Sequence, residues 1–152
     1  MVPKYINLKI NTKSKNRFYK KITKLAKRNA VIKSKIEMLN NLWSKDEDSD
    51  LKFIGDMCII DYVNNNVKDL AILYFRNKKT INWAQNSDCE LNVKHVLVVM
   101  SPLKKKMPEM VEKIKSTYIE KFSNNELLEE VCTCVDKNEL VKLFKSAGHG
   151  NE

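Results

Sequence analysis

Two residues that could take part in chemistry, Asp61 and Tyr62, stand at the end of a short apolar run. The stretch GDMCIIDY, residues 55–62, leads through Ile60 and then changes abruptly to Asp61 and Tyr62. A carboxylate can act as a nucleophile. A phenol, with a pKa of about 10, is mostly protonated near neutral pH and reacts poorly without a strong base. Asp61 and Tyr62 are therefore the first candidate site residues, and the polar loop VNNNVKD follows them.

Charged side chains supply two further candidates. Lys104, Lys105 and Lys106 follow an apolar run and precede Met107, so they could bind an anion or an acidic partner. The acidic stretch KDEDSD, residues 45–50, could hold a divalent cation for an aspartyl site. For both stretches a solvated loop is the more ordinary interpretation. We expect no metal ion and no other cofactor.

The two histidines and four cysteines do not form a familiar ligand or catalytic motif. His95 opens an apolar run, and we interpret it as a structural residue at a strand end or edge. His149 lies in the C-terminal tail, where we expect disorder. Cys58 reads as a small core residue. Cys132 and Cys134 are closer together than the cysteines of common zinc motifs, so we expect free thiols in a reducing cytoplasm.

The composition is that of an ordinary folded domain with an excess of basic residues. The chain has 152 residues, of which 43% are hydrophobic, and a formal net charge of +9. Such a charge favours an anionic partner, either nucleic acid or an acidic protein face. No helix-turn-helix or RNA-binding motif is visible, and no apolar run is long enough to cross a membrane. Part of the excess gathers on a predicted first helix, at Lys20, Lys21, Lys24, Lys27 and Arg28.

Hydrophobic periodicity predicts the elements that position these residues. Alternation in KYINLKI predicts a first strand. An N-cap at Ser14 predicts a helix to about Asn29, and the capping-box pattern SKIE predicts a second helix from Ser34. We expect the second helix to bury a stripe centred on Ile36, Leu39 and Trp43, widened by Met38 and Leu42.

The rest of the chain reads as buried strands followed by helices. MCII, LAILYF and KHVLVVM are continuously apolar, which is typical of strands covered on both faces. NKKTINW predicts a turn and a short edge strand. Pro108 predicts the first turn of a long helix, and the capping-box patterns SNNE and DKNE predict two shorter ones. The order predicts a three-layer α/β fold, a mixed sheet with helices on both faces, in a single domain over residues 1–152 with a core of about 4–146.

The order of these pieces resembles the mannitol/fructose-type enzyme IIA (EIIA) domain of the bacterial sugar phosphotransferase system. In that family a glycine turn leads to a strand ending in a phosphorylated histidine, within a phrase G-x-x-I-A-h-P-H in which h is apolar. FIGDMCIIDY stands in that place. VKHVLVVMSPLKKKMPEMVEKI is similar to the strand, loop and helix that carry a second histidine, and LLEEVCTCVDKNELVKLF to the closing helices. The resemblance extends from about Lys4 to Phe144 and implies the fold of that family.

The sequence departs from the family at the residues that carry its chemistry. The alignment puts Tyr62 at the accepting histidine and Asp61 at the preceding proline, and a shift of one residue would put Asp61 at the histidine instead. The second histidine's place falls at Lys106 or Met107. Tyr62 is a poor phosphoryl acceptor, whereas Asp61 could form a reactive acyl phosphate, generally with a divalent cation held by neighbouring carboxylates. Imidazole suits phosphoryl relay because it is largely neutral near physiological pH and its phosphorylated form stays reactive. The resemblance without these imidazoles implies a non-catalytic regulatory or interaction domain, of the kind found in sugar-responsive transcription regulators and antiterminators.

In this interpretation a protein partner, either a phosphotransferase component or a regulator domain, docks on Asp61, Tyr62 and the loop Lys104–Met107. Tyr62 should then lie at a strand end, in a shallow cleft, close to Lys106 and Met107. Two alternatives stay open. The chain could be an active phosphocarrier with another acceptor residue, or a basic nucleic-acid-binding domain.

Overall fold

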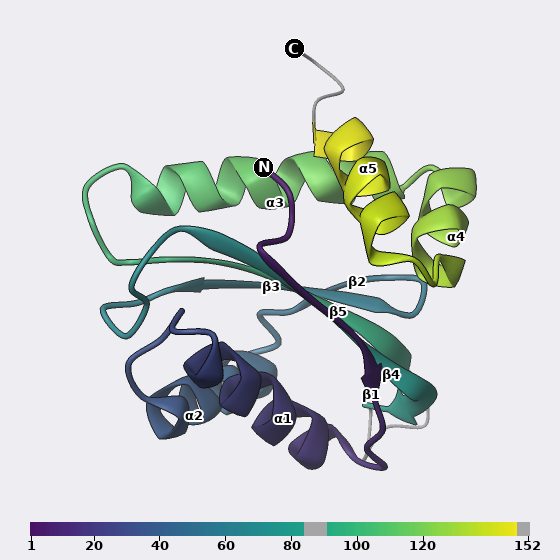
Figure 1. Ribbon diagram of the computed structural model, residues 1–152. Helices are drawn as coiled ribbons and strands as arrows, with labels where there is room; N and C mark the ends of the chain where they lie inside the picture. Colours follow the sequence, from purple (N-terminus) through teal and green to yellow (C-terminus); the bar gives the residue numbers. More distant parts are fainter. Residues whose placement is uncertain (84–90, 149–152) are drawn as a thin grey trace.

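The computed structural model describes residues 1–83 and 91–148. Within this part of the chain, a five-stranded sheet lies between two layers of helices (Figure 1). Two helices, α1 and α2, cover one face, and α3, α4 and α5 cover the other. This confirms the expected three-layer α/β fold with a mixed sheet. The elements are β1 Tyr5–Ile10, α1 Lys15–Arg28, α2 Lys35–Glu47, β2 Lys52–Ile54, β3 Met57–Val63, β4 Ala71–Asn82, β5 Asn92–Ser101, α3 Met107–Phe122, α4 Asn125–Thr133 and α5 Lys137–Gly148.

The sheet has the strand order β1-β4-β5-β3-β2. The pairs β1–β4 and β3–β5 are parallel, whereas β4–β5 and β2–β3 are antiparallel. Side chains along β3 alternate between two cores, because successive residues of a strand point to opposite faces. Cys58 and Ile60 belong to the core under α1 and α2, and Met57 and Ile59 belong to the core under the other three helices. Burial on both faces explains why MCII is continuously apolar.

The two N-terminal helices begin where their caps predict. Ser14 accepts a hydrogen bond from the amide of Arg17, and Ser34 accepts one from the amide of Glu37. The predicted stripe of α2 is shifted, however. Met38 and Leu42 are fully buried, while Ile36 is 66% exposed. The sequence alone could not show this rotation, because α2 is apolar on more than one side.

One strand prediction is wrong, and one short strand was not predicted. The residues of NKKTINW do not form a turn and an edge strand, because β4 continues through Asn82 between β1 and β5. A register shift between Arg76 and Ile81 accommodates the polar residues there. The short strand β2 was not predicted, and it joins β3 through Gly55, whose φ of 57° is an angle that glycine adopts without strain.

The C-terminal helices differ from the predictions in detail. Pro108 lies in the first turn of α3, as predicted. The cap of α4 is Asn124 rather than the predicted Ser123, since the Asn124 side chain accepts hydrogen bonds from the first amides of that helix. Among the described residues, no helix has the length and apolar character needed to cross a membrane.

Candidate functional site

Asp61 lies on β3, next to its C-terminal end, where the strand has passed beyond its pairing with β2. Its Oδ1 accepts a hydrogen bond from Lys115 Nζ of α3 at 3.0 Å, and its Oδ2 lies 3.6 Å from Lys45 Nζ of α2. Burial raises the pKa of this carboxyl, but the hydrogen bond from Lys115 and the charges of both lysines outweigh it, so the pKa is lowered. Asp61 is therefore an ionised carboxylate that pairs with one lysine from each helical layer, Lys45 of α2 and Lys115 of α3.

Tyr62 lies beside Asp61 but points to the opposite face, into the core under α1 and α2. It is only 2% exposed. Its hydroxyl donates to Asn41 Oδ1 at 2.8 Å and accepts from Asn66 Nδ2 at 3.1 Å. Burial raises the pKa of the phenol, which keeps it neutral. The predicted strand-end position is confirmed, but the shallow cleft is wrong, because a buried and doubly bonded hydroxyl offers no open surface.

Asn66 holds this arrangement together. Its Oδ1 accepts from the amide of Ser34 at 2.7 Å, and its Nδ2 donates to the Ser34 carbonyl at 2.8 Å as well as to Tyr62. The loop after β3 is thereby fixed to the connection between α1 and α2. Neither Asn41 of α2 nor Asn66 of the loop was predicted as a site residue. Asn41 lies 21 positions from Tyr62, and Asn66 lies 32 positions from Ser34 although only four from Tyr62, so no short sequence pattern indicates that the three side chains meet.

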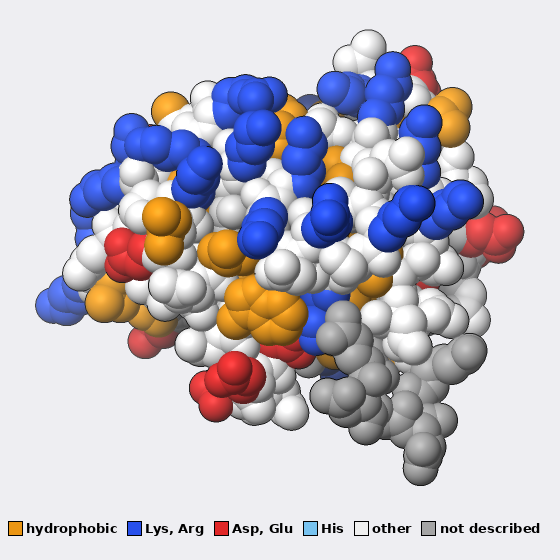
Figure 2. All heavy atoms as spheres, turned by 90° about the horizontal axis from the view of Figure 1, so that it is seen from below, with side chains coloured by type: hydrophobic (Ala, Val, Ile, Leu, Met, Phe, Trp, Pro, Cys, Tyr) orange, Lys and Arg blue, Asp and Glu red, His pale blue; other side chains and the backbone are white. Residues whose placement is uncertain are grey.

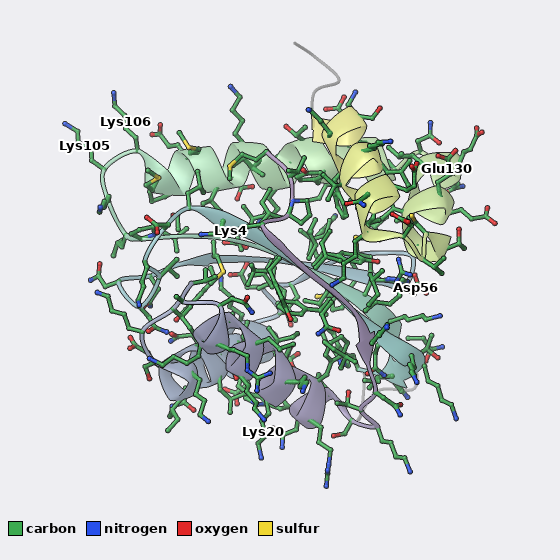
Figure 3. All side chains as sticks on the ribbon, in the orientation of Figure 1. Lys4, Lys20, Asp56, Lys105, Lys106 and Glu130 are labelled. Carbon is green, nitrogen blue, oxygen red and sulfur yellow. The ribbon has the colours of Figure 1, made fainter. Side chains whose placement is uncertain are left out.

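The loop Lys104–Met107 begins at the same end of the sheet. Val63 of β3 pairs with Ser101 of β5, and the loop to α3 follows directly. Lys105 and Lys106 are exposed and extend away from the body of the molecule (Figure 3). Within the described residues, no hydrogen bond or ion pair connects Tyr62 to this loop. The structure thus places Asp61 and the lysines near one end of the sheet while Tyr62 lies beneath it.

A second polar cluster occupies the opposite end of β5. One ligand-type atom each from Asp56, His95 and Cys132 lies within 4.8 Å of the other two. His95 was predicted at a strand end or edge, but it lies inside the central strand β5 and is 1% exposed. His149 falls outside the described residues. No sequence motif predicted this cluster, because its three residues come from distant parts of the chain: the turn before β3, strand β5 and helix α4.

Hydrogen bonds fix the proton on His95. Arg76 donates from Nε and Nη2 to the Tyr74 hydroxyl, which therefore donates its own proton to His95 Nδ1 at 2.6 Å. The remaining ring proton is then on Nε2, which lies 3.7 Å from Asp56 Oδ1. A metal ion would have to displace that proton close to the positive charge of Arg76. The cluster is thus better suited to orienting a neutral imidazole than to holding a cation.

The buried imidazole makes folding sensitive to pH. Burial first, then the charges of Arg76 and Lys94, lowers the pKa of His95 to about 3. Between the ordinary pKa of about 6.5 and that value, only the unfolded chain binds the proton, so stability falls as pH falls, by about 1.4 kcal/mol per pH unit. Urea unfolding gives the free energy of unfolding at pH 7 and at pH 5. Between these two pH values, the native protein should lose about 2 kcal/mol more stability than the His95→Phe variant, which has no imidazole at this position. Equal losses in both proteins would contradict the assignment.

Comparisons with known proteins agree with the three-layer fold described above. The family model of the phosphoenolpyruvate-dependent sugar phosphotransferase system, EIIA 2, matches residues 1–147. The chain belongs to this EIIA family. Comparison with curated protein sequences gives no match. The family model shows that this is an EIIA domain, and the similar solved structures show that it has the EIIA fold.

Similar solved structures include a nitrogen regulatory protein and two mannitol IIA structures. The nitrogen regulatory protein IIA-Ntr from Neisseria meningitidis has a TM-score of 0.76 and 16% identity, covering 91% of this chain and 92% of that one. Mannitol IIA from Escherichia coli has a TM-score of 0.69 and 8% identity, covering 91% and 94%. Mannitol IIA in complex with phosphorylated mannitol IIB from Escherichia coli has a TM-score of 0.68 and 8% identity, covering 93% and 94%. At these identities the likeness describes the fold.

Proposed function

We propose that residues 1–152 form a single non-catalytic, cytoplasmic EIIA domain that acts by binding a protein partner. The observation that carries the proposal is the Tyr62 hydroxyl, which is buried and bonded to Asn41 and Asn66 where the resemblance places the accepting imidazole. A buried neutral phenol cannot meet an incoming phosphoryl group. Asp61, the neighbouring alternative, is occupied by Lys115. This supports a domain that keeps the family framework and uses it for recognition.

The docking surface that we propose consists of Asp61, the loop Lys104–Met107 and the adjacent Leu103. Leu103 is 55% exposed, so the loop offers an apolar side chain beside its lysines. An exposed aliphatic group within a basic rim suits a partner with an acidic rim around an apolar centre. Tyr62 is buried in the core under α1 and α2 and takes no part in this surface. The partner would be a phosphotransferase component, or another domain of a sugar-responsive transcription regulator or antiterminator.

Phosphoryl transfer tests the non-catalytic part of the proposal. The chain is incubated with labelled phosphoenolpyruvate and the general phosphotransferase components, beside a mannitol-type EIIA domain with its histidine as positive control. We expect label on the control and none on this chain. Label on the native chain would refute the proposal. Its stability would then identify the acceptor, since acid releases phosphohistidine and hydroxylamine releases an aspartyl phosphate.

Binding tests the docking part. The isotope-labelled chain is titrated with the general phosphocarrier protein, and amide NMR shifts are followed. We expect shifts at Asp61 and at Leu103–Met107, and K104E/K105E should weaken binding about tenfold because it reverses the charge of the surface. The matched control, K20E/K24E, changes the same charge on α1 and should bind normally. Equal weakening by both variants would mean that net charge alone drives binding.

A further inference from the structure

The outer surface of α1 carries a concentration of basic side chains. The apolar face of this helix, including Phe18, Ile22 and Leu25, is buried against the sheet. Its solvent side is basic and its sequence, KNRFYKKITKLAKR, contains no acidic residue. Figure 2 shows the α1 and α2 side of the molecule, where blue Lys and Arg side chains form an extended area. This area lies on the opposite side of the sheet from α3.

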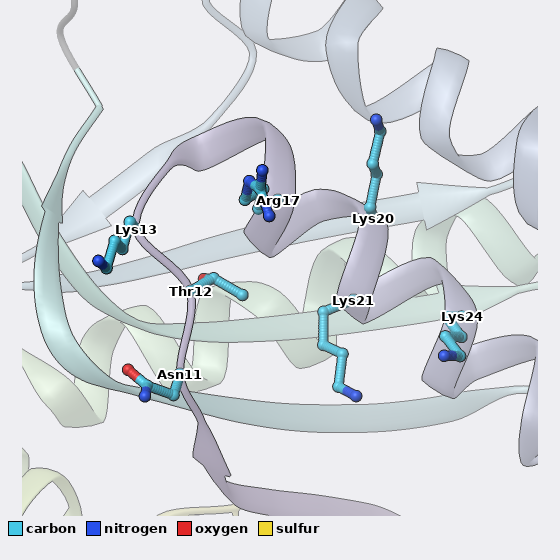
Figure 4. A pocket seen from close by; sticks show the side chains of 7 residues that line it. All are labelled: Asn11, Thr12, Lys13, Arg17, Lys20, Lys21 and Lys24. Carbon is cyan, nitrogen blue, oxygen red and sulfur yellow. The ribbon is translucent and has the colours of Figure 1, made fainter.

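A groove runs along one side of this basic surface. It has a volume of about 640 Å³ and lies between the loop after β1 and the first turns of α1 (Figure 4). The fully buried Asn77 fixes the loop, because its side chain accepts from the Thr12 amide at 2.8 Å and donates to the Thr12 carbonyl at 2.9 Å. The groove wall is therefore preformed. The lining residues are Asn11, Thr12, Lys13, Arg17, Lys20, Lys21 and Lys24.

The cations of the groove are available to a ligand. Over residues 1–83 and 91–148, no ion pair involves Arg17, Lys20, Lys21 or Lys24. Lys15, on the inner side of the same helix, pairs with Asp46 instead. Several unpaired cations on one helix side repel one another, and an anion of matching length would relieve that repulsion.

We propose that this α1 surface binds the phosphate backbone of double-helical nucleic acid. The basic side chains recur at intervals of three or four residues from Arg17 to Arg28, which spans about 16 Å at about 1.5 Å per residue. Each strand of the duplex carries one phosphate per about 3.4 Å of axis, so a length of about 16 Å presents about five phosphates of one strand to the row. The contacts reach only the backbone, so binding is independent of base sequence.

The same surface fits other anionic partners less well. Membrane-surface helices insert exposed apolar side chains, but the apolar side chains of α1 are buried. Stable protein interfaces need a sizeable apolar centre. The exposed side chains of α1 include no aromatic or large aliphatic residue, and beside them α2 exposes the single large aliphatic side chain of Ile36, which is a small centre for such an interface. Single strands bind by stacking their bases on aromatic rings, which α1 does not expose. A duplex backbone requires only ordered cations.

Fluorescence anisotropy with a labelled duplex of about 25 base pairs, titrated from low to physiological salt, tests the proposal. We expect an affinity whose logarithm falls linearly with the logarithm of the salt concentration. K20Q/K21Q/K24Q should make this slope shallower by about 2.7, because each phosphate that a lysine neutralises contributes about 0.9 to the slope. The matched control, K104Q/K105Q/K106Q, removes the same charge from the other surface and should keep the slope.

Several results would overturn the proposal. They are equal weakening in both triple variants, absence of binding at low salt, or tighter binding to anionic phospholipid vesicles or to polyglutamate than to the duplex. Dependence on one base sequence would also overturn it. The outcome is distinguishable from that of the proposed partner docking, because each surface has its own variants and each serves as the control for the other.

Discussion

Replacing Arg76 by methionine should lower the free energy of unfolding by about 4 kcal/mol, because the side chain makes several buried charge-assisted hydrogen bonds. Arg76 is 6% exposed and reaches from β4 to the end of α4. Its Nη1 donates to the Cys134 carbonyl at 2.6 Å, and its Nη2 donates to the Val131 carbonyl at 2.9 Å. Both carbonyls lie at the C-terminal end of α4, where the helix dipole also favours a cation.

The variant would leave the two carbonyls and the Tyr74 hydroxyl without their cation in a buried place. Urea unfolding at neutral pH measures the change in stability. Lys78→Met makes the same chemical change two positions along β4 at an exposed side chain, and should alter stability little. If Arg76→Met were as stable as Lys78→Met, the network would not contribute to folding as inferred.

Replacing Asn66 by alanine should cost about 3 kcal/mol, through the removal of buried hydrogen bonds to Ser34 and Tyr62. The side chain of Asn66 accepts from the Ser34 amide, donates to the Ser34 carbonyl and donates to the Tyr62 hydroxyl. Alanine removes these three interactions and a fourth, which the Lys33 amide donates to Asn66 Oδ1 at 3.2 Å, and it leaves the partners in a place where water has little access. The free energy of unfolding from urea titration measures the effect.

Asn65→Ala is the matched control, since Asn65 is the exposed neighbour in the same loop. It should change stability by less than about 0.5 kcal/mol. Equal stability of the two variants would contradict the role of Asn66 in holding the loop after β3.

The proposed functions assign separate tasks to the two sides of this EIIA domain. We propose Asp61 and the loop before α3 as one binding surface and the basic side of α1 as another, on the opposite side of the sheet from α3. Their separation follows from the three-layer architecture, in which the sheet stands between the helices. A domain of this construction can contact a protein partner and a polyanion at the same time, which suits a regulatory role.

Local sequence patterns determined the fold class and most helix starts. Ser14 and Ser34 cap helices through amides three residues away, so their effect is visible in a short window. The continuously apolar runs likewise predicted strands that are buried on both faces. Resemblance at the level of element order was sufficient to indicate the EIIA family, because the order of the main strands and helices follows from local patterns even though the length of β4 did not.

Only the tertiary structure decided the environment of each candidate residue. Asp61 and Tyr62 are neighbours in sequence, yet alternation along β3 sends one to the sheet edge and the other into the core. The partners Asn66 and Arg76 act across gaps of tens of residues, where chain folding alone brings the atoms together. Sequence determined which groups the chain carries. Packing determined which of them are buried, paired or free to meet a ligand, because burial and pairing depend on distances that the order of residues does not contain.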